Sequence, residues 1–547
     1  MMALLCLFFH LLTLGPTAAT ATRQFPGLIN GTIDEINQQL ESRCISSVDL
    51  VTTYTERINQ VNKIFRAVTE VNPETISQAR RLDEDRSASG HPSPLYGLPI
   101  LLKNVIATND EMNNTAGSYA MLGARNVREA GVVKKLREAG AVLLGKSNLS
   151  QWGGIRAIKH TNGWSAHGGQ VRGAYLQDQD PGGSSSGSAV AVDLGLAFAA
   201  LGVDTTGSIL IPAGRNNIVA IRPTLGLTSR DQVVPVSENF DVVGPMARTV
   251  RDAAHVLQAI SGPDEHDHLT LKASLPVPDF VTACHGASLQ GKRIGVPWNF
   301  IHALITGPPL NDGELETFRK ALDELQTAGA SIITANFTEV ADLKTWRNVV
   351  LGVDFPANMD TYLDGLATNP HQVRSLLSLR NWTQAHGHLE DYPNRDTGFW
   401  DVFLEKRTEG WSQSPDCKNY QDALVQMKKL GGDGGILGAI ERQQLDAVVM
   451  PTSITHRCVP FTGGPAITVP LGAYPEMTRV VRTSNGELVE TGPKLPFGLT
   501  FAGKPRSETK LIGIASEYEK LSNVRNKLRR SPAIHVPSAE LYSSCER

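Results

Sequence analysis

The sequence predicts an α/β sandwich whose central sheet is mostly parallel. Short apolar runs that suit buried strands, among them LPILL (98–102), AVLLG (141–145) and IVAI (218–221), alternate with segments of helical pattern. Such alternation is typical of parallel strands joined by crossover helices. The composition, with 41% hydrophobic and 20% charged residues, is that of an ordinary globular chain.

Residues 1–21 are predicted to be a signal peptide. Their apolar run is shorter than the ~20 residues that a membrane span needs, and small residues follow it. Cleavage after Ala19 or Ala21 fits the small-residue rule. An uncleaved N-terminal anchor is the alternative, because no Lys or Arg precedes the apolar run. We therefore expect a secreted protein that has no membrane contact once the signal is removed.

The elements expected after the signal peptide follow in order along the first half of the chain. They are a helical region at 34–61 with Ser46 or Ser47 as a cap, a strand at 95–103, an amphipathic helix at 127–139 and a strand at 141–145. The stretch 181–224 then predicts a glycine/serine loop, a small-residue apolar helix, a second glycine-containing turn at Asp204–Ser208 and the strand 218–221.

Two serines in this stretch are candidates for chemistry. Ser184 follows the paired glycines of PGGSSSGSA, and Ser208 stands in DTTGS, where glycine lets the backbone approach another group closely. A serine hydroxyl is a weak nucleophile. It needs a base to take its proton and donors to hold the oxyanion that forms on attack.

Lys103 is the candidate base, because none of the 14 histidines stands in a recognisable nucleophile context. It ends the apolar run 98–102, and burial lowers the pKa of a lysine so that part of it is neutral near working pH. The alternative is a strand-end lysine that reaches solvent, as most lysines do.

Ser185 lies at the centre of a sequence close to G-x-S-x-G, the nucleophile elbow of α/β-hydrolases. That motif requires a buried strand immediately before it. The preceding residues, AYLQDQDP, are acidic and end in proline, which makes a poor strand. The sequence therefore disfavours an elbow.

Several motifs in a fixed order resemble the amidase signature family of serine amidohydrolases. GLPILLKN resembles its lysine strand, PGGSSSGSA its glycine/serine loop and VDTTGSILIPA its nucleophile turn. Four further segments resemble the family's later blocks: VVPVSENFDVVGPMARTVRDAAHVLQAI, LDAVVMPT, GGPAITVPLG and LPFGLTFAG. The resemblance implies a three-layer α/β/α sandwich around a large mixed, mostly parallel sheet. It also implies one amidase domain over 22–547, with a variable segment at about 340–430 where substrate choice is expected to lie.

By position, Lys103, Ser184 and Ser208 match the family's Lys–cis-Ser–Ser triad. The resemblance implies that neutral Lys103 takes a proton from Ser184 while Ser184 takes one from Ser208. Ser208 would then attack the amide carbonyl and form an acyl-enzyme. It further implies a cis peptide bond between Gly183 and Ser184.

The resemblance also implies an oxyanion hole of backbone N–H groups and a set of supporting residues. The oxyanion donors are expected on Thr205, Thr206, Gly207 and Ser208, and the supporting residues are Gly183, Ser185 and Asp204.

Four positions depart from the family pattern. Asn104 stands where an aspartate is usual, Thr206 and Ser186 replace glycines, and Leu210 replaces an arginine that could pair with Asp204. A Cβ at Thr206 would strain a turn that needs positive φ there. These departures motivate an alternative, a catalytically impaired or acyl-transferring member of the fold.

The leading functional hypothesis is a secreted amidase that hydrolyses a small-molecule carboxylic amide to an acid and an amine or ammonia. A glutamine-dependent amidotransferase subunit, which the family also contains, is disfavoured by the secretory N-terminus. A net charge of −3 offers no basic field for nucleic acid. No cofactor or metal is expected, since Glu265–His268 and His386–His388 lack zinc-site spacing. The oligomeric state and the identity of the amide stay open.

Cysteines and sequons bear on the secretory prediction. Removal of the signal peptide with Cys6 leaves five cysteines, so one or two disulfides could form and at least one thiol stays free. Five N-glycosylation sequons begin at Asn30, Asn113, Asn148, Asn336 and Asn381. Asn148 lies in a segment that resembles the family's substrate cleft, so it is the least suited to carry a glycan.

Overall fold

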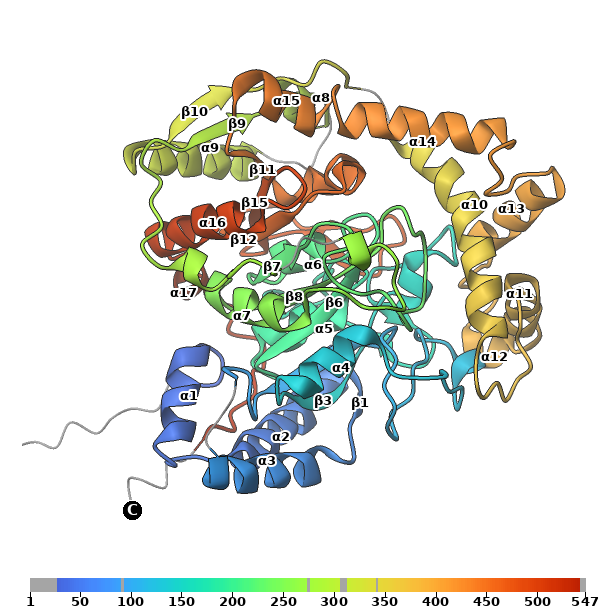
Figure 1. Cartoon of the computed structure of the whole chain (residues 1–547), viewed down its shortest axis with the longest axis horizontal. Coiled ribbons are helices and arrows are strands. Elements are labelled where there is room, and N and C mark those ends of the chain that lie inside the picture. The colour runs from blue at the N-terminus through green and yellow to red at the C-terminus, as the bar shows by residue number, and fades with distance from the viewer. Residues whose placement is uncertain (1–26, 90–92, 273–275, 305–311, 341–342, 542–547) are drawn as a thin grey trace, which may run out of the picture.

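The structure is a computed structural model that describes residues 27–89, 93–272, 276–304, 312–340 and 343–541 (Figure 1). The predicted signal peptide, residues 1–21, lies outside the described residues. Within them, no helix is both long enough and apolar enough to cross a membrane.

An eleven-stranded sheet runs through the molecule in the order β1-β3-β2-β6-β8-β7-β12-β15-β11-β9-β10. Its strands are β1 (Val68–Val71), β2 (Pro99–Lys103), β3 (Val142–Ser147), β6 (Ala199–Asp204), β7 (Val219–Arg222), β8 (Val242–Ala247), β9 (Arg293–Val296), β10 (Ser331–Thr334), β11 (Ala447–Pro451), β12 (Ala466–Ala473) and β15 (Pro496–Ala502). Two small ribbons pair β4 (Trp164–Ser165) with β5 (Gly169–Gln170) and β13 (Val481–Arg482) with β14 (Val489–Thr491).

The sheet is mixed, but it is not mostly parallel, which corrects the sequence-based expectation. Only β2–β3, β2–β6, β9–β11 and β9–β10 are parallel. The other neighbouring pairs, including every pair from β6 to β11 across the centre, are antiparallel. Helices cover the sheet, so its central strands are apolar in either direction, and the apolar runs alone do not reveal strand polarity.

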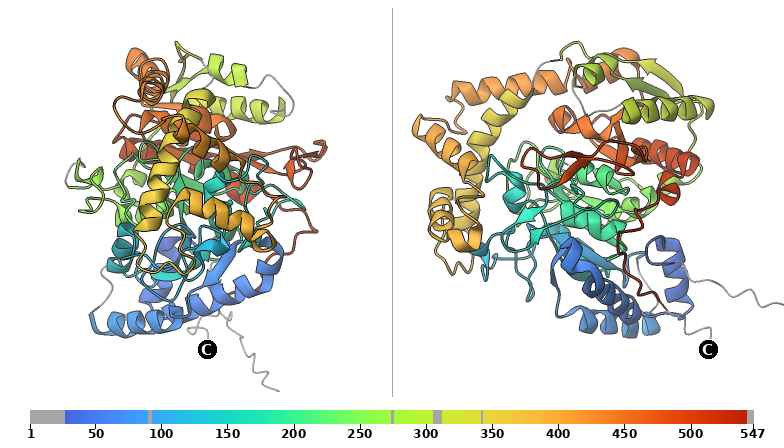
Figure 2. Two further views of the ribbon diagram at one scale, coloured as in Figure 1. Left: turned by 90° about the vertical axis from the view of Figure 1, so that its right-hand side faces the viewer. Right: turned by 180° about the vertical axis from the view of Figure 1, so that it is seen from behind.

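Helices pack around this sheet and complete the predicted α/β sandwich (Figures 1 and 2). The α-helices are α1 (Ile33–Glu41), α2 (Ser47–Phe65), α3 (Thr75–Ser89), α4 (Gly131–Glu138), α5 (Ser186–Asp193), α6 (Leu210–Arg215), α7 (Val250–Ile260), α8 (Trp298–Leu304), α9 (Asp312–Thr327), α10 (Leu343–Asp364), α11 (Leu376–Ala385), α12 (Gly387–Glu390), α13 (Gly398–Thr408), α14 (Lys418–Gly431), α15 (Ile436–Gln443), α16 (Glu508–Ser522) and α17 (Val524–Lys527). The 3₁₀ turns are η1 (Tyr119–Met121), η2 (Gln151–Gly154), η3 (Thr270–Lys272), η4 (Thr282–Cys284), η5 (Thr452–Arg457) and η6 (Val459–Thr462).

Local signals in the sequence place several of these elements correctly. Ser46 caps α2, because its hydroxyl accepts from the Asp49 N–H while the Asp49 carboxylate accepts from the Ser46 N–H. The apolar stretch after Ser184 differs from the prediction. The helix α5 ends at Asp193, and the residues that follow form the central strand β6. Small apolar residues suit a buried helix and a buried strand equally, so composition does not separate the two.

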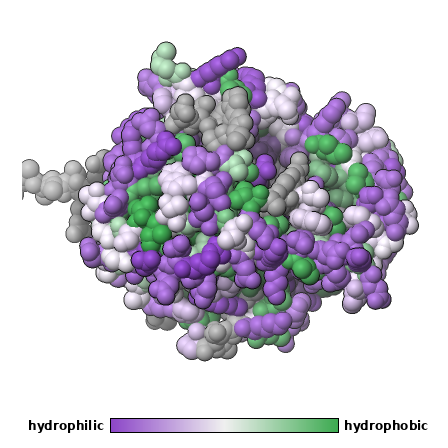
Figure 3. Space-filling view, turned by 90° about the horizontal axis from the view of Figure 1, so that it is seen from above, coloured by the Kyte–Doolittle hydropathy of each residue, from purple (hydrophilic) through white to green (hydrophobic). Residues whose placement is uncertain are grey.

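The variable segment forms a group of helices, α10 to α14, at the right of Figure 1. Helix α10 contacts both α13 and α14, so the group is held together mainly by its own packing. On the face shown in Figure 3, hydrophilic residues predominate and hydrophobic residues occur in small scattered groups. The extent of the single domain and of its variable segment stays a prediction.

Candidate active site

Lys103 and Ser184 meet in the interior of the protein. Lys103 ends β2, and its Nζ lies 2.7 Å from Ser184 Oγ and donates to the Val203 carbonyl at 3.0 Å. Both side chains are buried, at 2% and 3% exposure. Burial lowers the pKa of Lys103 to about 7, against the opposing effect of the Asp204 and Asp241 carboxylates. Lys103 therefore does not reach solvent, and part of it is neutral at neutral pH.

Gly183 and Ser184 are joined by a cis peptide bond, as the resemblance implies. A Cβ on Gly183 would stand 2.6 Å from Ser150 Oγ and 2.7 Å from Asn162 Oδ1, so a side chain at this position would have to displace both. The Ser184 carbonyl also accepts from the Ser150 N–H at 3.1 Å. These contacts fix the direction in which the Ser184 hydroxyl points.

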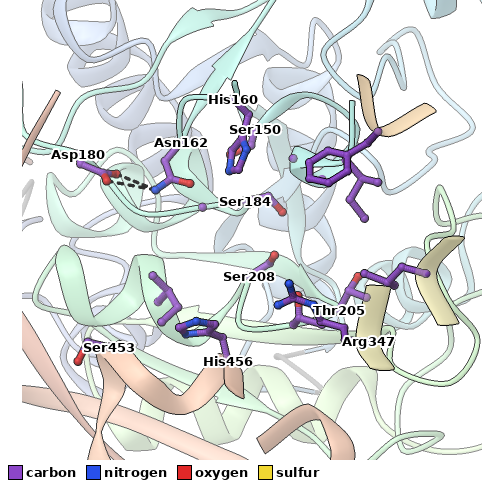
Figure 4. A pocket seen from close by; sticks show the side chains of 18 of the residues that line it. Ser150, His160, Asn162, Asp180, Ser184, Thr205, Ser208, Arg347, Ser453 and His456 are labelled. Atoms are coloured by element: carbon purple, nitrogen blue, oxygen red, sulfur yellow. Dashed lines mark hydrogen bonds between the residues drawn. The ribbon is translucent and has the colours of Figure 1, made fainter. Parts of the chain in front are cut away.

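Ser208 lies opposite Ser184 across the pocket shown in Figure 4. It is half-buried, so a substrate can reach its hydroxyl. Among the described residues, no hydrogen bond joins the Ser208 hydroxyl to Ser184 or to any other group. Of the two hydrogen bonds that the relay needs, the one between Lys103 and Ser184 is therefore present, and the one between Ser184 and Ser208 is absent from the described residues.

The expected oxyanion donors divide into two kinds. The Gly207 N–H donates to Asp204 Oδ1 at 2.9 Å, so it is already occupied, which corrects its assignment to the oxyanion hole. The N–H groups of Thr205, Thr206 and Ser208 make no hydrogen bond within the described residues. All three residues line the pocket. Three donors are thus available to a developing oxyanion.

The Asp204 carboxylate holds the nucleophile turn through hydrogen bonds to its backbone. Its Oδ2 accepts from the Ile209 N–H at 2.7 Å, in addition to the bond from Gly207. Arg222, at the end of β7, places its Nε 3.3 Å from Asp204 Oδ1, and both side chains are fully buried. The cation that Leu210 cannot supply is therefore supplied by Arg222, a residue that the sequence analysis missed.

Asp241 holds the same turn through the Thr205 side chain. Its Oδ1 accepts from the Thr205 hydroxyl at 2.6 Å, and its Oδ2 accepts from the N–H groups of Val236 and Ser237. Burial raises the pKa of Asp241 to about 6, although these donors favour the ionised form. Sequence analysis included Asp241 in a motif but assigned it no role, because its partner Thr205 is 36 residues away.

Ser185 acts on the backbone around the triad rather than on Ser184 directly. Its hydroxyl donates to the Val203 carbonyl at 3.2 Å, and its N–H donates to the Ser208 carbonyl at 3.1 Å. It immediately precedes α5 and follows no strand, which agrees with rejecting the elbow. Ser185 thereby ties the glycine/serine loop to the end of β6 and to the nucleophile turn.

The other departures from the family pattern are accommodated locally. The positive φ of the turn falls on Gly207, at 104°, and not on Thr206, so the strain expected at Thr206 is absent. Asn104 is fully buried and donates to the hydroxyls of Thr69 and Thr115. Its role is to hold the loop 113–117 against β2.

A cavity of about 790 Å³ opens above the two serines. One side is polar and includes Asp180, Arg215 and Glu314. Figure 4 shows Asp180 with its hydrogen bonds to Asn162. The other side is formed largely by the variable segment, whose contributions include Phe399, Val402, Phe403 and Trp411. The segment thus borders the pocket, as the sequence analysis anticipated for a substrate wall.

Comparison with known proteins shows the family of this chain. The model of the Amidase family matches residues 49–512. The chain belongs to the amidase family. A relative from Arthroderma benhamiae, named as an amidase, is 45% identical over 532 residues, which cover 92% of this chain and 88% of the relative. The crystal structure of a peptide amidase from Stenotrophomonas maltophilia is 32% identical with a TM-score of 0.78, and the match covers 92% of this chain and 98% of that chain.

The amidase family includes more than one kind of enzyme. A glutamyl-tRNA(Gln) amidotransferase subunit of Lactobacillus johnsonii is 31% identical over 392 residues, which cover 70% of this chain and 77% of that protein. The family and the structural match together identify the present chain as a hydrolase of the amidase type, which acts on C–N bonds.

Among the described residues, no three His, Cys, Asp or Glu side chains come together in a way that could hold a metal ion. His386 instead stacks on Trp382, with ring centroids 4.1 Å apart.

Proposed function

We propose that this protein is a secreted amidase that hydrolyses a carboxylic amide to an acid and an amine or ammonia through an acyl-Ser208 intermediate. The observation that carries the proposal is the buried contact of 2.7 Å between Lys103 Nζ and Ser184 Oγ. A lysine whose pKa lies at about 7 can act as a base near neutral pH. It touches a hydroxyl that faces a second, accessible hydroxyl.

The first half of the reaction forms an ester and releases the amine. Neutral Lys103 accepts the Ser184 proton while Ser184 accepts the proton of Ser208, and the Ser208 oxygen bonds to the amide carbon. The resulting oxyanion receives hydrogen bonds from the N–H groups of the nucleophile turn. The proton returns through Ser184 to the amide nitrogen, the C–N bond breaks, and the amine or ammonia leaves.

The second half of the reaction restores the enzyme. A water molecule gives its proton to the same relay and attacks the carbonyl carbon of the acyl-Ser208 ester. The bond between that carbon and Ser208 Oγ breaks, and the proton returns to Ser208. The products are a free acid and an unchanged enzyme, so one water is consumed for each amide.

Two features support secretion. Residues 1–21 have the length and composition of a signal peptide. Cys44 is disulfide-bonded, while Cys284, Cys417 and Cys458 are free. Disulfides persist mainly in oxidising compartments.

The test is covalent labelling of the purified protein with a fluorophosphonate, followed by mapping of the modified serine. We expect labelling at Ser208, and none in Ser208→Ala, Ser184→Ala or Lys103→Ala. Ser77→Ala is the matched control, because Ser77 is an exposed serine of α3 and its loss leaves the site intact. Hydrolysis of an amide library by wild type and variants should follow the same pattern.

Two results would contradict the proposal. One is amide hydrolysis that persists in Ser208→Ala. The other is a fluorophosphonate adduct on a serine other than Ser208 in the wild-type protein. For secretion, the contradicting result is a protein that stays in the cells with residues 1–21 attached when it is expressed in a eukaryotic host.

A further inference from the structure

We propose that Glu314 determines the substrate specificity of this site and selects amides that carry a protonated amine several atoms away from the scissile bond. The inference rests on the proposed amidase function, and it names the class of substrate. It follows from the charges of the pocket, which differ on the two sides of Ser208 and Ser184.

Glu314 is a buried carboxylate in the wall of the reaction pocket. It lies in the first turn of α9, only 2% of its surface is exposed, and it is among the residues that line the cavity. Its Oε1 accepts from the Ser453 hydroxyl at 2.9 Å and its Oε2 from the Tyr474 hydroxyl at 3.3 Å. Within the part of the chain that the structure describes, Glu314 has no ion-pair partner.

The nearest cation is already committed to other groups. Arg215 donates from Nε to the Asp180 carbonyl at 2.9 Å and from one terminal nitrogen to the Glu490 carbonyl at 2.6 Å. That terminal nitrogen also lies 3.9 Å from the Asp180 carboxylate. Asp180 is further satisfied by Asn162 and by the Gly182 N–H. Arg215 therefore balances Asp180, and Glu314 is left as an uncompensated acid.

Such a carboxylate is poorly stabilised without a partner. Burial raises the pKa of Glu314 to about 7, and only two neutral hydroxyls and the distant Arg215 oppose that shift. A buried acid is stabilised best by an opposite charge with good hydrogen-bond geometry. A primary ammonium group in the pocket would supply both, since it carries three donors. A neutral substrate would leave the Glu314 carboxylate without an opposite charge.

The distance from the nucleophile sets the length of the substrate. His456 adjoins the nucleophile turn, because a Cβ on Gly207 would stand 2.8 Å from His456 Cβ. Ser453, which binds Glu314, lies three residues earlier in η5, or about 6 Å along a 3₁₀ turn. Helix α6 leads from Ser208 towards Arg215 over six residues, or about 9 Å. The Glu314 carboxylate is therefore set apart from the Ser208 hydroxyl, so an ammonium group that binds it must be joined to the amide by a spacer of several atoms.

The opposite side of the pocket is suited to apolar groups. Phe399, Val402 and Phe403 of α13 line it, and Ile158 faces the same space. Arg347 of α10 also lines the cavity (Figure 4), and its positive charge would repel an ammonium group. Lys406, on the same helix, is paired with Glu409 at 2.8 Å. The two sides therefore give one substrate orientation, with the cation towards Glu314 and any apolar substituent towards α13.

The experiment compares pairs of amides that differ only in charge. On the acyl side the pair is 6-aminohexanamide and heptanamide, and on the amine side it is N-(5-aminopentyl)acetamide and N-hexylacetamide. Within at least one pair, we expect wild-type kcat/KM to be about tenfold or more higher for the cationic member. In Glu314→Gln the ratio should fall to near one, while the neutral member is still hydrolysed. Glu316→Gln is the matched control, since Glu316 is an exposed acid of the same helix that pairs with Lys320.

The pH dependence of the ratio provides a second measurement. Lys103 must be neutral for either member of a pair, so its titration cancels in the ratio. The ratio should rise from pH 6 to pH 8 as Glu314 ionises, and it should be flat in Glu314→Gln. Arg215, Asp180, Glu490, His456 and Tyr474 are the other charged or titratable residues that line the cavity near Glu314. Burial lowers the pKa of His456 to about 4 and raises the pKa of Tyr474, so neither residue titrates between pH 6 and pH 8. Tyr474→Phe, which removes one donor from Glu314, should move the rise to higher pH.

The outcomes separate the specificity proposal from the amidase proposal. A wild-type ratio near one in both pairs, or a preference for the cation that survives Glu314→Gln, overturns the role of Glu314. Equal losses for both members of a pair in Glu314→Gln also overturn it, because they indicate structural damage. Fluorophosphonate labelling of Ser208 in the same variant reports independently on the catalytic centre.

Discussion

Arg222 and Asp204 form an ion pair in which neither side chain is exposed, with Arg222 Nε 3.3 Å from Asp204 Oδ1. Arg222 also donates to the Phe240 carbonyl at 2.8 Å. The Asp204 carboxylate in turn accepts from two N–H groups of the nucleophile turn. The position of that turn therefore depends on a strand end 14 or more residues further along the chain as well as on the turn's own residues.

Removing Arg222 should destabilise the protein strongly. Arg222→Ala leaves the Asp204 carboxylate buried without its counter-ion, and breaking a buried ion pair in this way typically costs about 3–5 kcal/mol. The measurement is the free energy of unfolding from urea titration. Arg479→Ala, at an exposed arginine, is the control and should change stability by less than about 0.5 kcal/mol. Equal stability of the two variants would show that the buried pair does not hold the fold together.

Activity should rise with pH through a midpoint near 7. Burial lowers the pKa of Lys103 to about 7, so the neutral, basic form predominates above that pH and is lost below it. Lys103→Arg keeps a positive charge at every pH and should lower kcat/KM by about 10²–10⁴. Lys146 offers a matched control, because it is equally buried in the adjacent strand β3 but donates to the Ile106 carbonyl. We expect Lys146→Met to keep the wild-type midpoint. A shifted midpoint in Lys146→Met would contradict the assignment of Lys103 as the base.

Glycine is required at position 207 and not at position 206. Gly207 has a φ of 104°, and an added Cβ would stand 2.8 Å from His456 Cβ. Gly207→Ala should therefore displace the turn together with the free N–H groups of Thr206 and Ser208, and lower kcat by about 10²-fold or more. Thr206→Gly, whose wild-type φ is not positive, should leave kcat unchanged or lower. A faster Thr206→Gly variant would mean that Thr206 does strain the turn.

If the protein is secreted from a eukaryotic host, we expect N-glycans only at sequons whose asparagine is exposed. Asn30, Asn336 and Asn381 are exposed, whereas Asn148 is fully buried and donates to the carbonyls of Arg66 and Gly169. Peptide mapping before and after enzymatic deglycosylation should find occupancy at one or more of the exposed sites and none at Asn148. A glycan on Asn148 would require a different conformation of the segment 147–151.

The sequence predicted the parts of the site that act through a local motif. Ser184, Ser208 and the cis bond after Gly183 belong to short glycine-containing turns, and Lys103 ends a recognisable apolar strand. It did not predict Arg222 or Asp241, because both act on the turn from segments that come near it only in the folded chain. It wrongly included Gly207 among the oxyanion donors, since the bond to Asp204 depends on a side-chain rotamer.

The polarity of the strands shows the same limit. Apolar runs located the strands β2, β3 and β7 within a few residues, because strand burial determines composition. They did not indicate that the central pairs from β6 to β11 are antiparallel, since both polarities bury the same side chains.

By itself, the amino-acid sequence indicated the family, the two candidate serines and the candidate base, because each depends on residues that are neighbours along the chain. Only the tertiary structure decided which groups hold the nucleophile turn and which acid in the pocket has no counter-ion. Those properties depend on burial and on distances between remote segments. The pairing of Asp204 with Arg222 and the isolation of Glu314 are both consequences of how the strands and helices pack.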